Sequence, residues 1–145
     1  MEEKEKGLIP TFFWKTQILE SHLDCFGHVN NATYLQLFEA ARWDFITAGG
    51  FGLKEIMAAQ KGPVILEATV KFKRELKNRD WIEISSAISG RPGEKICHIH
   101  QVIVCMSDGK VASTAQFTAG FFDLKERKLI APTEKWIKAM GQIST

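Results

Sequence analysis

The segment that decides the fold runs from His22 to Asp44 and reads HLDCFGHVNNATYLQLFEAARWD. It begins as a polar loop and continues as an amphipathic helix. From Asn31 onward the apolar residues recur at steps of three and four, which predicts a helix over residues 31–48. Asn30 is a good N-cap, and Gly49-Gly50 is expected to end the helix. The predicted buried face holds Tyr34, Leu37, Phe38, Ala41, Phe45 and Ala48, and the polar face holds Glu39, Arg42 and Asp44.

The rest of the chain predicts an antiparallel sheet. Aromatic and β-branched residues predict a first strand over 12–19. Further strands are expected at about 64–73, 80–89, 94–107 and 110–123, and Asp108-Gly109 predicts a hairpin between the last two. Short helices are expected over 53–60 and within 132–140. This order indicates an α+β fold in which a curved antiparallel sheet wraps around one long central helix.

Composition narrows the class of protein. A chain of 145 residues, 45% of them hydrophobic, is expected to form a single domain over 1–145, with residues 1–7 as a flexible charged lead-in. The net charge of +2 does not favour nucleic acid as a partner. No apolar run approaches the roughly 20 residues of a membrane span, and the charged N-terminus has no signal-peptide pattern behind it. Three cysteines without a C-x-x-C pair argue against a disulfide framework, so a cytoplasmic protein is expected.

The loop and the start of the long helix together suggest a reaction. Asp24 lies seven residues before Asn31, and Gly27 between them permits a tight reversal of the chain. The amides of a first helical turn lack intrahelical partners and sit at the positive end of the helix dipole. The loop is therefore expected to place a carboxylate near free amides. A reaction that develops negative charge on a carbonyl oxygen uses such an arrangement.

A family resemblance is carried by the same residues. The pattern Asp24-x-x-Gly27-His28-Val29-Asn30-Asn31-x-x-Tyr34-Leu35, followed by Glu39-Ala40-Ala41-Arg42, resembles the signature of hotdog-fold acyl-CoA thioesterases of the 4-hydroxybenzoyl-CoA thioesterase-like superfamily. The fuller segment 22–44 is most similar to the bacterial long-chain acyl-CoA thioesterase III branch. The order and length of the expected elements agree with that family over essentially the whole chain.

The resemblance implies a reaction and a set of partners. The reaction is the hydrolysis of a fatty acyl-CoA, medium- to long-chain, to a free acid and CoA without a metal or redox cofactor. Asp24 matches the family's catalytic carboxylate, which either activates water or attacks the thioester directly. The backbone amide of Asn31 matches the oxyanion donor. Family members are homodimers, often paired into tetramers, whose active sites lie at the dimer interface.

The other motif residues are expected to have supporting roles. For His28, a direct role in positioning water or contacting the substrate carbonyl and a structural role in the loop both remain open. Gly27 serves as the hinge and Asn30 as the cap. Glu39 and Arg42 are three residues apart, so they are expected to pair across one helical turn and to help orient the catalytic loop.

Binding residues for the two ends of the substrate follow from charge and hydropathy. Lys73 and Arg74, in a cluster with Lys71, are expected to contact the phosphates of CoA. The apolar residues Phe38, Phe45, Leu66 and Val70 suit an acyl tail, although core packing explains them equally well. No metal site is expected, because His98 and His100 share one strand face while Cys97 and Cys105 point to the other.

Three alternatives remain at this stage. A thioesterase that acts on acyl-carrier protein is the nearest, and a basic face for the acidic carrier would favour it. A non-catalytic hotdog acyl-CoA-binding protein would bind the thioester without turnover. A hotdog hydratase is a further option, but its sites use a different pairing of Asp and His.

Overall fold

The computed structural model describes residues 8–91 and 93–141, so the predicted lead-in 1–7 lies outside the described residues. The expected strands and helices are all present, with ends that shift by a few residues. A 3₁₀ turn and a two-residue strand were not predicted. The elements in chain order are β1 (Phe12–Gln17), η1 (Glu20–His22), α2 (Asn31–Ala48), α3 (Leu53–Ala59), β2 (Lys61–Phe72), β3 (Trp81–Ser89), β4 (Ile96–Cys105), β5 (Val111–Asp123), β6 (Lys128–Leu129) and α4 (Glu134–Ala139).

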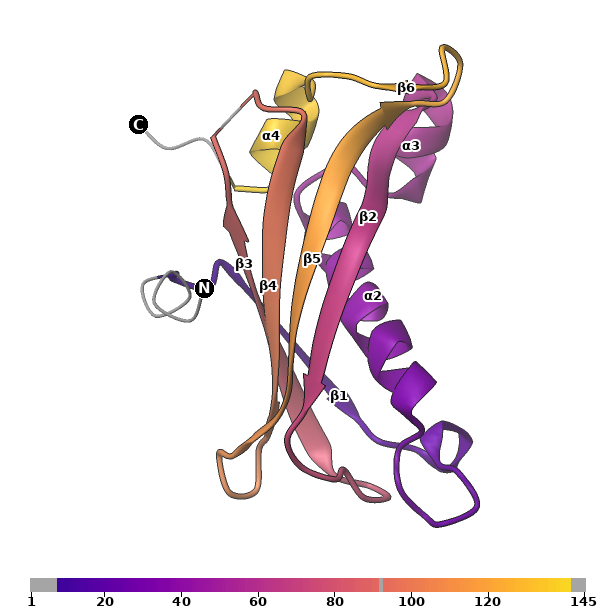
Figure 1. Ribbon diagram of the computed structural model, residues 1–145, viewed down its shortest axis with the longest axis vertical. Helices are drawn as coiled ribbons and strands as arrows, with labels where there is room; N and C mark the ends of the chain where they lie inside the picture. Colours follow the sequence, from indigo (N-terminus) through magenta and orange to yellow (C-terminus); the bar gives the residue numbers. More distant parts are fainter. Residues whose placement is uncertain (1–7, 92, 142–145) are drawn as a thin grey trace.

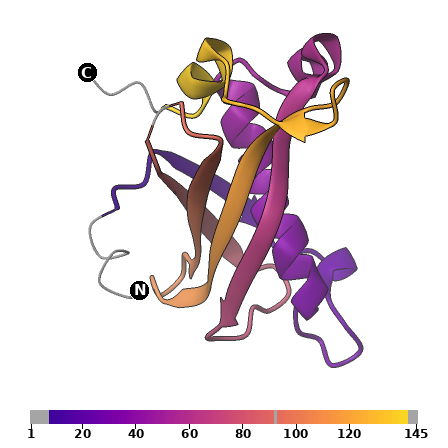
Figure 2. The same cartoon turned by 45° about the horizontal axis from the view of Figure 1, so that its top comes forward.

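The strands form one antiparallel sheet in the order β1-β3-β4-β5-β2, with β6 paired to the end of β5. The sheet curves, and α2 lies along its inner face with α4 at one end (Figures 1 and 2). This is the predicted α+β arrangement of a curved sheet around one long helix. The first strand, β1, pairs with β3, so β2 lies at the opposite edge of the sheet.

The core forms where the helix meets the inner face of the sheet. On β4 the residues alternate, so that Ile99, Gln101 and Ile103 point inward and are buried. From α2, Phe38 is fully buried and its ring meets Phe117 of β5 edge-on at 6.0 Å. Burying an aromatic or aliphatic side chain of this size contributes about 1.5–3 kcal/mol each. The inward-facing apolar residues of the sheet therefore fix the position of α2.

The predicted buried face and the predicted polar face of α2 are each wrong at one residue. Five of the six predicted face residues are buried, but Ala48 is exposed and Ile46 is buried instead. Arg42, assigned to the polar face, turns inward and is half-buried. Gly50 has the positive φ of +92° at the end of the helix, whereas Gly49 remains helical. Packing of α2 against α4 and the sheet decides which of these residues are buried and where the helix ends. The helical repeat of the sequence alone does not decide this for residues at the edge of a face or at the end of the helix.

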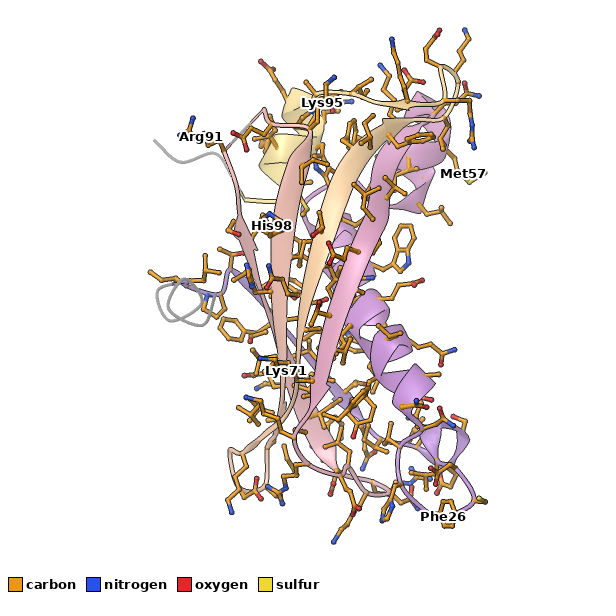
Figure 3. All side chains as sticks on the ribbon, in the orientation of Figure 1. Phe26, Met57, Lys71, Arg91, Lys95 and His98 are labelled. Atoms are coloured by element: carbon orange, nitrogen blue, oxygen red, sulfur yellow. The ribbon has the colours of Figure 1, made fainter. Side chains whose placement is uncertain are left out.

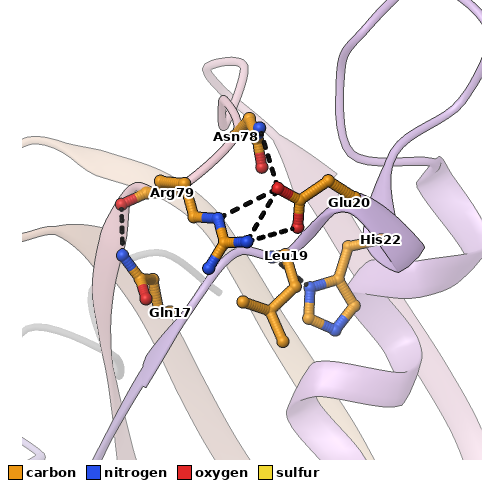
Figure 4. Close-up of polar contacts among 6 residues, drawn as sticks. All are labelled: Gln17, Leu19, Glu20, His22, Asn78 and Arg79. Atoms are coloured by element: carbon orange, nitrogen blue, oxygen red, sulfur yellow. Dashed lines mark hydrogen bonds and ion pairs between the residues drawn. The ribbon is translucent and has the colours of Figure 1, made fainter.

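The chain between β1 and the loop is held by a polar cluster on η1 (Figure 4). The Arg79 guanidinium donates to both carboxylate oxygens of Glu20 at 2.8 Å, and Asn78 donates to the same carboxylate at 3.5 Å. The Nδ1 atom of His22 accepts the Leu19 amide at 2.9 Å. His22 therefore braces the entry to the loop.

None of the helices in the described ranges combines the length and apolar composition that a bilayer crossing requires.

Candidate active site

The loop before α2 is closed on itself by backbone hydrogen bonds. Leu23 and Val29 form a β-bridge, and the Asp24 amide donates to the His28 carbonyl at 2.8 Å. Gly27 has a φ of +79°, a conformation that L side chains rarely adopt, and its amide donates to the Asp24 carbonyl at 3.1 Å. The glycine hinge predicted at this position is confirmed. Phe26 lies at the tip of the loop, away from the sheet (Figure 3).

The Asp24 carboxylate is fixed by the same turn. Its Oδ1 atom accepts the amides of Phe26 at 2.9 Å and His28 at 3.3 Å. In the described part of the chain, no hydrogen bond reaches its Oδ2 atom. The carboxylate is half-buried, so one oxygen is anchored while the other is available to a ligand.

The start of α2 is capped as predicted. The Asn30 side chain accepts the Ala32 amide at 2.9 Å, and the Asn31 side chain accepts the same amide at 3.0 Å. The Thr33 amide donates to the Asn30 carbonyl. Within the described residues, the Asn31 amide donates to no protein acceptor, as expected of the first residue of a helix. This amide is available to an oxygen of a ligand.

Asp24 and Asn31 line the same hollow, which has a volume of about 460 Å³. Lys73 and Arg74 lie on its rim, so the structure brings the predicted catalytic and CoA-binding residues together. Lys71 lines a separate hollow; it points from the other face of the sheet, as does His98 (Figure 3). The remaining lining residues of the larger hollow are Val29, Tyr34, Phe72 and Glu75.

Hydrogen bonds and burial shift the pKa values of side chains at the rim of the hollow. Arg74 forms an ion pair with Asp108, and this hydrogen bond raises the pKa of the guanidinium. Hydrogen bonds from the Lys110 amide and then from Arg74 lower the pKa of Asp108. The Tyr34 hydroxyl donates to the Arg74 carbonyl at 3.3 Å, and burial raises the pKa of this tyrosine. The Phe72 ring meets Tyr34 edge-on at 5.1 Å. Tyr34 and Phe72 thus support the segment that carries the two cations.

His28 is held by a residue far away in sequence. Its Nε2 atom lies 3.1 Å from the Glu75 carboxylate, and its backbone forms a β-bridge with Lys77. Among the described residues, the lining of the hollow does not include His28. This geometry favours the structural role for His28 over direct contact with substrate. The sequence carries no signal for Glu75, because 47 residues separate it from His28.

The predicted pairing of Glu39 with Arg42 is wrong. In the described residues no ion pair joins them; Glu39 accepts the Trp43 indole N–H at 3.3 Å. Arg42 instead donates to Gln101 Oε1 at 3.0 Å and lies over the Phe117 ring. Both residues line a second hollow, away from Asp24. Helical spacing permitted the pair, but a buried acceptor on β4 competes for the guanidinium.

The described residues contain no group of three or more side chains suited to a metal ion. As predicted, His98 and His100 lie on one face of β4 and Cys97 on the other, so the histidines and the cysteine cannot meet at one ion. His98 contacts Thr118 at 3.4 Å and His100 contacts Ser89 at 3.2 Å. These contacts give both histidines structural partners.

Comparison with known proteins identifies the family. Residues 19–140 match the family model of the thioesterase-like superfamily. The chain belongs to this superfamily. Membership makes it a thioester hydrolase, and the hotdog fold predicted from residues 22–44 is confirmed.

Three members of the thioesterase superfamily illustrate the likeness. The chain is 32% identical to the long-chain acyl-CoA thioesterase FadM of Escherichia coli over 110 residues, which are 76% of this chain and 82% of FadM. It is 26% identical to the acyl-acyl carrier protein thioesterase ATL3 of Arabidopsis thaliana, over 88% of this chain and 67% of ATL3. The crystal structure of YbaW, a probable thioesterase from Escherichia coli, aligns with a TM-score of 0.77 and 27% identity, covering 92% of this chain and 99% of YbaW.

Proposed function

We propose that the protein hydrolyses a medium- to long-chain fatty acyl-CoA to the free acid and CoA. One observation carries this proposal: the Asp24 carboxylate and the N-terminus of α2 line one hollow with the cations Lys73 and Arg74 on its rim. The acid and the amide suit a thioester carbonyl, and the cations suit the phosphates of CoA. The similarity to FadM supports an acyl-CoA substrate.

In the proposed reaction Asp24 supplies the base or the nucleophile. Two amides hold its Oδ1 atom, so the carboxylate keeps one orientation while Oδ2 faces the substrate. As a base it takes a proton from the attacking water, which adds to the carbonyl and displaces the CoA thiolate. As a nucleophile it displaces the thiolate itself and forms an anhydride that water then cleaves to the free acid and the regenerated carboxylate. Both routes use the same carboxylate in nearly the same place.

The oxyanion is assigned to the backbone of Asn31. Its amide has no protein acceptor among the described residues and sits at the positive end of an 18-residue helix. Such a donor stabilises the negative charge that develops on the thioester oxygen, and losing one donor typically costs about 10²–10³ in rate. His28, held by Glu75, positions the loop that carries Asp24.

The test is the rate of thiol release from a panel of acyl-CoA thioesters by wild-type and Asp24→Asn protein. Asn keeps the size of the side chain, so the turn before α2 is preserved while the base is removed. We expect turnover to fall by about three orders of magnitude or more. Asp44→Asn, on the exposed surface of α2, is the matched control and should match the wild type.

Two outcomes separate the alternatives. Parental turnover by Asp24→Asn would overturn the mechanism. Tight binding of acyl-CoA by the wild type without any turnover would support a non-catalytic binding protein instead.

A second candidate substrate is an acyl-acyl carrier protein, which the similarity to ATL3 favours. The hollow accommodates the same thioester in both cases, because CoA and the carrier share the reacting group. Comparing kcat/KM for one acyl group on CoA and on carrier protein distinguishes the two. Preference for the carrier by more than tenfold would replace acyl-CoA in the proposal.

The protein is further proposed to act as a homodimer that assembles into a tetramer. The edge strand β2 supports this: no other strand in the described residues pairs with its outer edge. It also exposes Leu66 and Phe72. Unpaired edges with apolar side chains are surfaces that proteins normally cover. Light scattering after gel filtration measures the state directly.

A further inference from the structure

The two cations at the rim of the active-site hollow differ in their partners. The Arg74 guanidinium forms an ion pair with Asp108, in the turn between β4 and β5. Lys73 forms no ion pair with any residue that the structure describes. The β4–β5 turn and the loop before α2 lie at the same end of the sheet (Figure 1). Of the two groups proposed to bind CoA, Arg74 is therefore already paired with a carboxylate.

The β4–β5 turn presents this carboxylate to Arg74. The Oδ1 atom of Asp108 accepts the Lys110 amide at 3.0 Å, and its Oδ2 atom accepts the guanidinium. Gly109 has a φ of +70°, and its amide donates to the Cys105 carbonyl at 2.8 Å. The backbone of a tight hairpin thus sets the position of Asp108.

The backbone of Arg74 is held at the rim by other bonds. The amides of Lys73 and Arg74 both donate to the Ala112 carbonyl, at 2.9 Å and 3.1 Å. The Arg74 carbonyl accepts the Tyr34 hydroxyl at 3.3 Å. Because these bonds fix the segment without the ion pair, the effect of Asp108 falls on the guanidinium itself.

The ion pair reduces what Arg74 can offer to a phosphate. Carboxylate and phosphate oxygens bind the same N–H groups of a guanidinium, so the two anions compete for them. The Arg74 and Asp108 side chains are 37% and 32% exposed, so a ligand in the hollow can reach the pair. The bond to Asp108 raises the pKa of Arg74, and the charge of Asp80 adds a smaller rise.

We propose that Asp108 weakens the binding of CoA by competing with its phosphates for Arg74. Asp108 is thus a positioning residue that acts through Arg74. The proposal rests on the proposed function, in which Arg74 binds the nucleotide end of CoA, and it names the group that limits this affinity. The nucleotide is the same in substrate and product, so the competition also favours release of CoA after hydrolysis.

The test measures the affinity of free CoA for the wild type and for Asp108→Asn by isothermal titration calorimetry. Asparagine keeps an oxygen for the Lys110 amide and turns its NH₂ group toward Arg74, so the turn is preserved while the guanidinium is released. We expect Asp108→Asn to bind CoA about two- to fivefold more tightly, the range that partly exposed ion pairs contribute. Unchanged or weaker binding would overturn the proposal.

Two further measurements separate competition from a structural effect of the substitution. The non-hydrolysable thioethers S-octyl-CoA and S-octyl-pantetheine differ only by the nucleotide and its phosphates. The gain in Asp108→Asn should appear with the first and be absent with the second. It should also shrink between about 0.02 M and 0.5 M salt, because ions screen partly exposed charges. Equal gains with both thioethers, or a gain that salt does not change, would contradict competition for a phosphate.

Variants of the two cations locate the effect. In an Arg74→Ala background, Asp108→Asn should no longer tighten CoA binding. In a Lys73→Ala background, it should tighten binding as in the wild type. A full gain without Arg74 would mean that Asp108 repels the ligand directly, and would reject its action through Arg74.

Asp123→Asn is the matched control. Asp123 lies at the other end of β5, and its Oδ1 atom accepts the amides of Lys125 at 2.9 Å and Glu126 at 3.0 Å. Within the described ranges, no ion pair involves its carboxylate. This variant makes the same chemical change in a similar turn and should bind CoA as the wild type does.

These affinities do not depend on turnover, so the two proposals can fail separately. Tighter CoA binding by Asp108→Asn in a protein that hydrolyses no acyl-CoA would reject the thioesterase function and retain the role of Asp108. Hydrolysis of acyl-CoA without any gain in affinity would do the reverse. No binding of CoA by any of these proteins would overturn the role of Asp108.

Discussion

The His28 imidazole lies 3.1 Å from the Glu75 carboxylate and thereby joins the loop that carries Asp24 to the segment that follows β2. The same two segments are linked by a β-bridge between His28 and Lys77 and by the Val29 amide, which donates to the Leu76 carbonyl. Asp24 lies on one segment, and Lys73 and Arg74 lie on or beside the other. The proposed catalytic and CoA-binding groups therefore belong to one hydrogen-bonded unit.

The role of the Asn31 backbone can be tested with proline. Asn31 is the first residue of α2, where proline is well tolerated, and Asn30 before it has the extended conformation that proline requires. Asn31→Pro removes the amide hydrogen together with the side chain, and we expect a near-normal melting temperature and a loss of kcat of about 10²–10³. Steady-state kinetics and thermal melts measure the two effects.

Asn31→Ala is the companion variant, because it removes the side chain and keeps the amide. It should retain activity within a few-fold. An equally large loss in Asn31→Ala and in Asn31→Pro would assign the role to the side chain. Asn30→Ala removes the cap on Ala32 and should lower the free energy of unfolding by about 1 kcal/mol.

The second prediction concerns the cations at the rim of the active site. Lys73→Ala and Arg74→Ala should each raise KM for an acyl-CoA several-fold and leave kcat nearly unchanged, because they bind the substrate equally well before and during the reaction. The effect should vanish with an acyl-pantetheine thioester, which lacks the nucleotide. Lys95→Ala, at the opposite end of the sheet, serves as control (Figure 3). An equal rise in KM for both thioesters would contradict nucleotide binding by these residues.

The third prediction concerns the pH dependence of stability. Hydrogen bonds from its own backbone region, from Arg79 and from Asn78 lower the pKa of Glu20 below its usual value of 4.5. A carboxyl group with a lowered pKa in the folded state adds stability above its unfolded pKa and loses it as the pH falls through the folded one. Glu20→Gln should therefore melt below the wild type at neutral pH, and the difference should shrink as the pH falls below about 4.5 and disappear below the lowered pKa of the folded state.

Thermal melts of both proteins between about pH 3 and pH 7 measure this difference. Glu126→Gln is a suitable control, since this carboxylate forms no ion pair in the described part of the chain. A constant gap between the melting temperatures of wild type and Glu20→Gln at all pH values would show that the charge of Glu20 is not the cause.

Local patterns were sufficient to predict much of this protein. The cap at Asn30, the hinge at Gly27 and the length of α2 follow from interactions within a few residues of sequence, where propensity and hydrogen bonding act directly. The alternation along β4 likewise predicted which face carries His98 and His100. The motif in residues 22–44 then identified the family, because the same short segment holds the acid and the helix start.

Tertiary structure alone decided the partners of these residues. Glu75 reaches His28 only because β2 returns antiparallel beside the loop, and Gln101 reaches Arg42 only because β4 passes beneath α2. Helical spacing allowed Arg42 to pair with Glu39, but burial in an apolar wall made a fixed amide on the sheet its partner instead. Such contacts depend on how distant strands come together. The sequence by itself therefore determined the loop, the helix and the groups proposed to react, and the folded sheet decided what surrounds them.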